Sequence, residues 1–529
     1  MLVRKFGVLI VGLTMVLAMG LSWTACGGDT QPPSETNGSD GGSSDGDAVA
    51  ESSKEPLYPK LTEGPKNNGP GGPQKEFTKD DLYKNCAYIS GGEKDVDHHN
   101  IVLMFDGYLL LPWAPESGGG GISFFDIQDP CKPKRVGSPY SPFMRESHSV
   151  GMAQVGDRWY AVVNGIQSIT EGGIQFWDIT DVTKPKVVSN VKLPGFLYPD
   201  AYKRVVLSVF WQGQYVYAAG SQNGIYIVDA KDPKKPKYVG KYQFEPVMEA
   251  GQVQVVGNLM VVITAEEART VLLDVSDPVK PQPRPNGELL IKDKEGTQRK
   301  AYFGTTTNGY LYYARKDKGG GVIVYDIRDP DNPKYAGDYK SGFNGGYVYV
   351  KDNLAFTGES SIGQIYDISN LADIKVVNSL TLVGDLDTVT PVGNVAVLSV
   401  DDKAEKGKGT SFAPYDTKVD TNPPSVTWVY PADKAKGLPT TSRIGLTFSE
   451  FVDPKSVWHS SVRVYTQEKP HKVVEGWLNA QESIVNFSPK RPLEPKTTYI
   501  LEVPAGGVKD YNGNAISEVF TMTFTTGSR

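Results

Sequence analysis

The strongest constraint on the fold of this chain is a repeat: an apolar run that ends in aspartate recurs seven times between residues 121 and 416. Clear copies are Ile225-Tyr-Ile-Val-Asp229 and Val322-Ile-Val-Tyr-Asp326, and the last copy is degenerate. The spacings are 52, 51, 45, 52, 41 and 49 residues, between Asp126, Asp178, Asp229, Asp274, Asp326, Asp367 and Asp416. A period of this length predicts one supersecondary unit that is repeated.

Each unit has room for four short strands. Residues 152–163 and 253–263 each contain two strand-like runs around a tight turn, upstream of the apolar run. After the aspartate, most copies continue with Asp-Pro and Pro-Lys, as in residues 129–134, and then a further strand. One such sheet cannot bury both of its faces, but seven sheets arranged radially can. The sequence therefore predicts an all-β fold with a seven-bladed β-propeller.

The last copy lacks its fourth strand, whereas residues 82–89 form a strand candidate that stands alone before the first copy. We expect this N-terminal piece to supply the missing outer strand and close the ring. Cys86 would then lie on that strand, with Cys131 on the outer turn of the neighbouring blade. A Cys86–Cys131 disulfide is possible in an exported protein. The alternative is that the two outer strands lie beyond the ~7 Å Cα limit for a bridge.

The repeat resembles the LVIVD family of bacterial surface propellers, whose name spells the apolar run before the aspartate. The resemblance covers residues 82–418 and implies the fold far better than any activity. The repeated aspartates are expected to accept backbone hydrogen bonds in the following turn. A calcium-binding role is the alternative, although no dense Asp-x-Asp pattern accompanies them.

The N-terminus reads as an export signal. Arg4 and Lys5 precede an apolar run over residues 6–25, which ends at Cys26. It resembles a bacterial lipoprotein signal, which implies lipidation of Cys26, attachment to the bilayer and a place on the outer membrane or cell surface. Ordinary secretion and a retained membrane anchor are the alternatives. Residues 26–80 are rich in Gly, Ser, Asp, Pro and Asn, which predicts a disordered tether.

The last part of the chain follows a different pattern. Alternating strand candidates predict a β-sandwich, at residues 444–450, 462–465, 484–487, 498–503 and 520–525. The segment resembles the bacterial Ig-like domain of S-layer proteins (SbsA type) in motifs such as Thr447-Phe-Ser-Glu-Phe-Val-Asp453. Asp510 and Asn514 read as turn formers, with a calcium role left open. The expected domains are a signal peptide (1–25), a tether (26–80), a propeller (81–421) and an Ig-like sandwich (422–529).

Composition excludes several classes of function. Lys and Arg total 55 against 61 Asp and Glu, so no basic excess supports nucleic-acid binding. The 3 cysteines exclude a cysteine-based zinc fold. No nucleophile elbow, His-Glu-x-x-His pair or P-loop is visible.

Candidate site residues occupy the same position in each copy of the repeat, eight residues before the turn of the first strand pair. This position is called the station below. The station is held by His99, His148, Val205, Glu249, Ala301, Asn344 and Asp385, and Arg204 precedes one apolar member. Because innermost strands begin at the mouth of the central channel, we expect this ring to face water there. Opposed polar groups could bind a cation or a polar ligand. The tentative ligand set is His99, His148, Arg204, Glu249, Asn344 and Asp385. The alternative is a mouth that is merely solvated.

These observations favour a non-enzymatic lipoprotein that binds or adheres to an extracellular protein or polysaccharide through a propeller face, without a cofactor. Two alternatives stay open. One is a hydrolase or lyase at the channel mouth, with His99 and His148 as acid, base or metal ligands. The other is a purely structural envelope protein.

Overall fold

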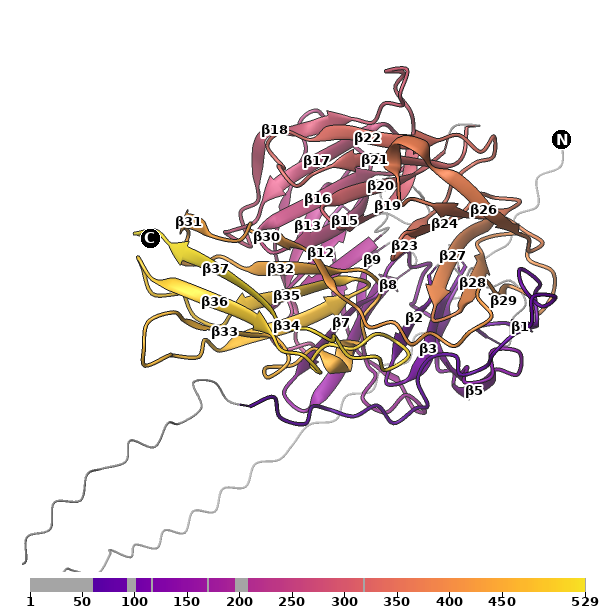
Figure 1. Cartoon of the computed structure of the whole chain (residues 1–529), viewed down its shortest axis with the longest axis horizontal. Helices are drawn as coiled ribbons and strands as arrows, with labels where there is room; N and C mark the ends of the chain where they lie inside the picture. The colour runs from indigo at the N-terminus through magenta and orange to yellow at the C-terminus, as the bar shows by residue number, and fades with distance from the viewer. Residues whose placement is uncertain are drawn as a thin grey trace, which may run out of the picture. The chain divides into compact units, whose positions relative to one another are not determined.

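In the part of the chain that the structure describes, six four-stranded antiparallel sheets and one five-stranded sheet follow one another along the chain. The strands of each sheet are ordered as in the sequence, except in the last sheet, whose outer strand comes from the N-terminal part of the chain. These sheets form the seven-bladed propeller, and a two-sheet sandwich follows it (Figure 1). The computed structural model describes residues 60–92, 101–115, 118–168, 171–195, 208–316 and 319–528. Among these residues, no helix has the length and apolar character needed to cross a membrane. Cys26, the expected signal peptide and most of the expected tether lie outside the described residues.

The strands of the first four blades are as follows. Blade 1 contains β2 (Leu103–Phe105), β3 (Tyr108–Trp113), β4 (Gly120–Asp126) and β5 (Lys134–Gly137), with β6 (Tyr140–Ser141) added beside β4. Blade 2 contains β7 (Gly151–Val155), β8 (Arg158–Ser168), β9 (Glu171–Asp178) and β10 (Lys186–Lys192). Blade 3 contains β11 (Ser208–Gln212), β12 (Tyr215–Ala219), β13 (Ile225–Asp229) and β14 (Lys237–Tyr242). Blade 4 contains β15 (Ala250–Val256), β16 (Leu259–Thr264), β17 (Arg269–Asp274) and β18 (Gln282–Leu290).

The other three blades repeat this order. Blade 5 contains β19 (Ala301–Thr307), β20 (Tyr310–Arg315), β21 (Val322–Asp326) and β22 (Lys334–Tyr339). Blade 6 contains β23 (Val348–Lys351), β24 (Leu354–Gly358), β25 (Gly363–Asp367) and β26 (Lys375–Leu380), with a short 3₁₀ turn at Leu371–Asp373. Blade 7 contains β27 (Leu386–Val392), β28 (Val395–Val400), β29 (Thr410–Pro414) and β1 (Ala87–Ile89).

The ring closes as the sequence predicts. The N-terminal strand β1 pairs antiparallel with β29, with Ala87 opposite Phe412 and Ile89 opposite Thr410, and completes blade 7. Figure 1 shows indigo β1 beside orange β29. Cys86 and Cys131 form a disulfide with their Cα atoms 5.0 Å apart, which joins this closing strand to blade 1.

The repeated aspartates end the third strand of six blades and form the turn that follows, whereas Asp416 of blade 7 lies two residues beyond the end of β29. In all seven blades a carboxylate oxygen accepts the backbone N–H two residues later, at 2.8 to 3.1 Å. The predicted turn role is therefore confirmed, and its physical basis is the short Asp side chain, which reaches its own backbone two residues on.

The C-terminal sandwich packs two four-stranded sheets face to face. The first contains β30 (Val426–Tyr430), β32 (Ile444–Phe448), β35 (Ile484–Pro489) and β34 (Gly476–Gln481). The second contains β31 (Ala435–Leu438), β37 (Phe520–Thr526), β36 (Thr498–Val503) and β33 (Arg463–Thr466). A 3₁₀ turn at Pro454–Ser456 precedes β33. The sandwich has its own core, in which Leu446, Val485 and Leu501 are fully buried.

The expected tether needs a correction over residues 60–80, which lie against both domains. The Asn67 amide donates to Asp453 at 2.7 Å, and the Asn68 amide donates to Asp106 at 2.8 Å. The Gly72 N–H donates to the Tyr511 carbonyl at 2.8 Å. The Asn and Gly residues that suggested disorder instead make close polar contacts, because glycine lets the two backbones approach each other.

Candidate functional site

One face of the propeller is covered by the C-terminal sandwich. The hairpins that join the first and second strands lie on this face, and those of blades 1 and 3 to 7, together with strand β7 of blade 2, contact the sandwich. The contacts involve Asp106, Met152, Gly213, Gly257, Asn308, Asp352 and Gly393. The opposite face, where the inner strands begin, is called the mouth face below. The described members of the expected ring, His148, Glu249, Ala301, Asn344 and Asp385, lie at or just before the starts of inner strands, on the side of the mouth face.

Asn486 of β35 is the polar centre of this docking. Its side chain is fully buried and touches two blades. The amide oxygen accepts the Gly257 N–H at 2.7 Å and the Gln212 amide at 3.0 Å, while the amide nitrogen donates to the Val255 carbonyl at 2.8 Å. One side chain thus provides hydrogen-bond partners for polar groups on two propeller blades. Such partners are needed because a polar group buried in an interface without one is costly.

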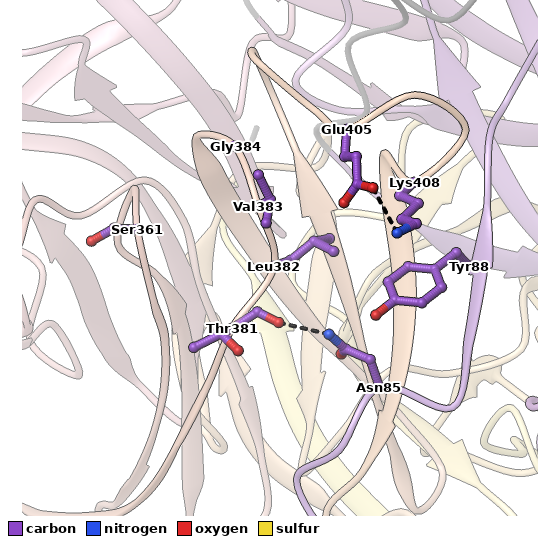
Figure 2. Close-up of a pocket in the computed structure, with 9 residues that line it drawn as sticks. All are labelled: Asn85, Tyr88, Ser361, Thr381, Leu382, Val383, Gly384, Glu405 and Lys408. Carbon is purple, nitrogen blue, oxygen red and sulfur yellow. Dashed lines mark hydrogen bonds and ion pairs between the residues drawn. The ribbon is translucent and has the colours of Figure 1, made fainter.

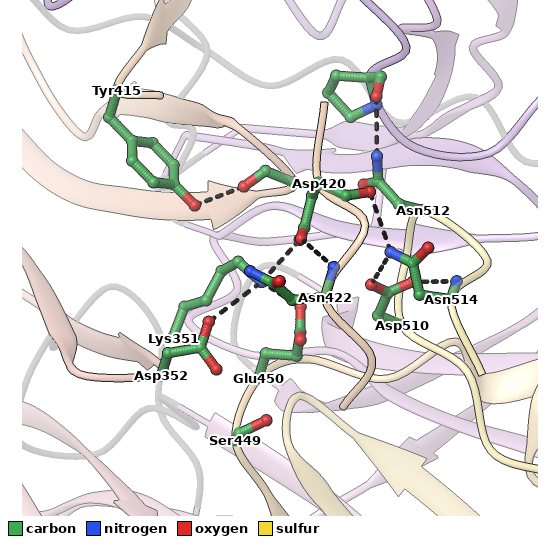
Figure 3. A network of polar contacts seen from close by, with 12 residues as sticks. Lys351, Asp352, Tyr415, Asp420, Asn422, Ser449, Glu450, Asp510, Asn512 and Asn514 are labelled. Atoms are coloured by element: carbon green, nitrogen blue, oxygen red, sulfur yellow. Dashed lines mark hydrogen bonds and ion pairs between the residues drawn. The ribbon is translucent and has the colours of Figure 1, made fainter. Parts of the chain in front are cut away.

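A second polar contact joins blade 6 to the sandwich (Figure 3). The Lys351 ammonium lies 2.8 Å from Asp420 and also pairs with Glu450. Asp510 completes a group of three carboxylates whose oxygens lie within 4.8 Å of one another. Asp420 follows Asp416 by four residues, one more than the spacing between Asp126 and Asp129 in blade 1, and its carboxylate accepts the Asn422 N–H at 3.0 Å. Glu450 lies in the Ig-like motif identified in the sequence, but nothing in the sequence indicated that it pairs with Lys351.

This group is an ion cluster rather than an open cation site. The Lys351 ammonium supplies the positive charge that a divalent ion would bring to Asp420 and Glu450. Asp510 is engaged as the expected turn former, since its two oxygens accept the backbone and side-chain N–H groups of Asn514 at 2.8 Å each. Burial alone would lower the Lys351 pKa, but the nearby Tyr415, Glu450 and Asp420 raise it above its ordinary value.

We expect the protein to become less stable as the pH rises from about 5 to about 8. Burial raises the pKa of four junction carboxyls: Glu450 to about 8, Glu482 to about 7, and Asp453 and Asp510 to about 6. Between their ordinary and folded pKa values, the folded state keeps protons that the unfolded chain has released. The stabilisation is therefore complete below pH ~4 and is lost as the pH rises through the folded values. Thermal midpoints measured at unit pH steps test this.

Two variants provide the control for the pH experiment. Glu482→Gln should flatten the decline of the thermal midpoint with pH, because glutamine stays neutral at every pH and one of the four titrations is removed. The substituted residue is buried, and its carboxylate accepts the Gln254 amide of the propeller at 3.1 Å. Glu468→Gln changes an exposed carboxylate and should leave the decline intact. A midpoint that rises with pH in the unmodified protein would contradict the assignment.

Aromatic side chains fill the axis of the propeller and bury His148. Phe303 stacks on His148 with ring centroids 4.9 Å apart and on Tyr347 at 4.5 Å. These residues come from blade 5 and from the segments before blades 2 and 6, so they meet at the axis. On the side of the sandwich, Tyr349 contacts Phe451 at 5.4 Å. The axis is thus packed from near the mouth to the sandwich.

The expected exposure of His148 is therefore wrong: the residue is 2% exposed. Its Nε2 lies 3.2 Å from Glu146, and its Nδ1 shares a hydrogen bond with the Tyr347 hydroxyl. Sequence spacing placed the residue at the correct station but could not show that bulky neighbours from blades 5 and 6 cover it. A buried imidazole gives no support to an acid–base role at the mouth.

The other ring members divide into two groups. His99 and Arg204 lie outside the described residues. Glu249, Asn344 and Asp385 are half-buried. The Asn344 amide donates to the Ser360 hydroxyl at 3.2 Å, and Glu249 accepts the Gln222 amide at 3.0 Å.

A groove of about 400 Å³ lies between blades 6 and 7 (Figure 2), and Asp385 follows its lining residue Gly384 in the chain. It is lined by Asn85, Tyr88, Ser361, Thr381, Leu382, Val383, Gly384, Glu405 and Lys408. Tyr88 of the closing strand is 43% exposed, and the Lys408 ammonium lies 5.2 Å from its ring centroid. Glu405 pairs with Lys408 at 2.8 Å. The groove thus joins an aromatic face to amide, hydroxyl and charged groups, and sequence spacing alone did not reveal it.

Known proteins resemble the two domains separately. No curated protein matches the chain. The propeller of Cps50 (Swd1) from Myceliophteria thermophila is 12% identical, with a TM-score of 0.42 over 60% of this chain and 97% of that one. The WD40 propeller of Doa1 is 14% identical, with a TM-score of 0.41 over 64% of this chain and 97% of that one. Residues 420–526 match the bacterial Ig-like domain family. The sheets of this chain form the propeller, and the segment that follows is similar to the bacterial Ig-like domain family, an arrangement that fits a binding or structural envelope module.

Proposed function

We propose that this protein is an envelope lipoprotein, anchored through a lipidated Cys26, that binds an extracellular protein or polysaccharide at its mouth face and catalyses no reaction. Cys26 would tether the chain to the outer membrane or cell surface, and the LVIVD-like propeller would present its mouth face to the partner.

The observation that carries the proposal is the one-sided coverage of the propeller. Every blade contacts the sandwich on one face, six through the inner hairpin and blade 2 through strand β7, so that face has little surface left for a partner. The mouth face keeps the groove beside Tyr88, whose exposed ring and neighbouring Lys408 are groups that recognition surfaces use. A binding surface, unlike an active site, needs no exposed acid–base residue. The burial of His148 is therefore compatible with a binding role.

Protein and polysaccharide arrays, probed with the mature full-length chain, test the proposal. We expect a saturable partner whose affinity falls at least ~10-fold, or about 1.4 kcal/mol, in the double variant Tyr88→Ala, Lys408→Ala. Val519→Ala changes an exposed residue of the sandwich, 58% exposed, and should leave binding intact. No binding on either array would favour the structural alternative. Binding that survives the double variant would show that the mouth-face groove is not the binding site, and would overturn the proposal for that face.

A further inference from the structure

A second cleft, of about 600 Å³, lies where blade 2 meets the C-terminal sandwich. The β7–β8 hairpin at residues 154–156 forms one wall, and Trp458 and Trp477 of the sandwich line the other. Thr62 of the N-terminal segment closes one end, where its N–H donates to the Ser460 hydroxyl at 3.0 Å. The volume lies within the ~300–1,000 Å³ range of small-molecule sites, which are frequent at domain boundaries.

Both indoles in the cleft are half-buried and held in place. The backbone of Gly64 packs directly on Trp458, since a Cβ there would come within 2.4 Å of the indole nitrogen. Trp477 lies opposite Ser488 on the neighbouring strand β35 and against the Gly213 hairpin of blade 3. Rings fixed in this way present large amphipathic surfaces and lose little conformational entropy when a ligand binds.

The polar groups of the cleft lie around its rim and balance in charge. Gln154, His459, Glu475 and Lys490 are exposed there. Arg463 also lines the cleft, but its buried guanidinium pairs with Glu502. The exposed carboxylate of Glu475 and ammonium of Lys490 then supply hydrogen-bond acceptors and donors without an excess of either charge, so neither an anionic polymer nor a basic peptide is favoured. Apolar ring faces combined with mixed rim donors and acceptors match a neutral ligand that has C–H faces and many hydroxyls.

We propose that this cleft binds a neutral oligosaccharide, with sugar rings against Trp458 and Trp477 and hydroxyls bonded to the rim. The site is separate from the mouth face and does not depend on the proposed function. An extended peptide with apolar side chains is the competing occupant, because Leu478 and Phe487 also line the cleft.

Isothermal titration of the mature full-length chain with cellotriose, chitotriose and mannotriose tests the proposal. We expect at least one trisaccharide to bind with a Kd below ~1 mM and to lose at least tenfold in affinity in Trp477→Leu. Glu475→Gln, an exposed change that leaves the packing intact, should weaken binding by a smaller factor and guards against misfolding of the Trp477 variant. Tyr88→Ala, on the mouth face, is the matched control and should bind normally.

Three outcomes would overturn the proposal. They are no binding of any of the three sugars, binding that is unchanged in both cleft variants, and binding that is lost in Tyr88→Ala alone. Failure here leaves the array experiment on the mouth face unaffected, because the two sets of variants lie on different surfaces.

Discussion

Replacing Lys351 by methionine should lower the free energy of unfolding by about 3–5 kcal/mol at pH 8, the usual cost of removing one partner from a buried ion pair. Lys351 is the cation paired with Asp420 and Glu450, and its side chain is 8% exposed. Methionine keeps the apolar stem but leaves the carboxylates facing one another. Denaturant unfolding of the full chain measures the effect.

The loss should shrink as the pH falls to about 5, because the raised pKa of Glu450, about 8, lets that carboxyl take up a proton in the folded state. Lys375→Met is the control, since Lys375 pairs with Asp373 at 3.0 Å on the surface and both side chains are more than half exposed. That variant should unfold like the unmodified protein. A loss relative to the unmodified protein that is absent at pH 8, or equal at pH 8 and pH 5, would show that the ion pairs do not hold the junction.

Asn486→Ala should destabilise the docking of the two domains by roughly 3 kcal/mol or more. The change leaves the Gly257 N–H, the Val255 carbonyl and the Gln212 amide without their partner, and a buried group left unpaired costs about 1–3 kcal/mol. Each group lies on the propeller, so the loss falls on the junction and not on the core of either domain.

Limited proteolysis of the connection at residues 416–424 reports on the docking directly. We expect Asn486→Ala to be cut there many times faster than the unmodified chain at the same protease concentration, because opening of the junction exposes the connection. Asn332→Ala removes an exposed asparagine of blade 5 and should change neither proteolysis nor stability. An unchanged cutting rate in Asn486→Ala would contradict the central role of this side chain.

Most of the fold could be predicted because its determinants are local and repeated. The apolar run, the aspartate and the turn residues act within about 50 residues, so the same interactions recur in every blade and identify the repeat in sequence. Even the long-range closure by residues 87–89 followed from a count of strands, since blade 7 lacked a partner that only the N-terminal piece could supply.

The site depended on contacts that no local pattern encodes. The sequence placed His148 at the start of an inner strand, but Phe303 and Tyr347 bury it from blades 155 and 199 residues away along the chain. The junction shows the same limit: Lys351, Asp420 and Glu450 lie in three unrelated segments, and an ion pair needs only that they meet in space. The sequence by itself therefore determined the blades and their number. Only the tertiary structure decided which face the sandwich covers, because burial and charge pairing between distant segments depend on how the whole chain packs.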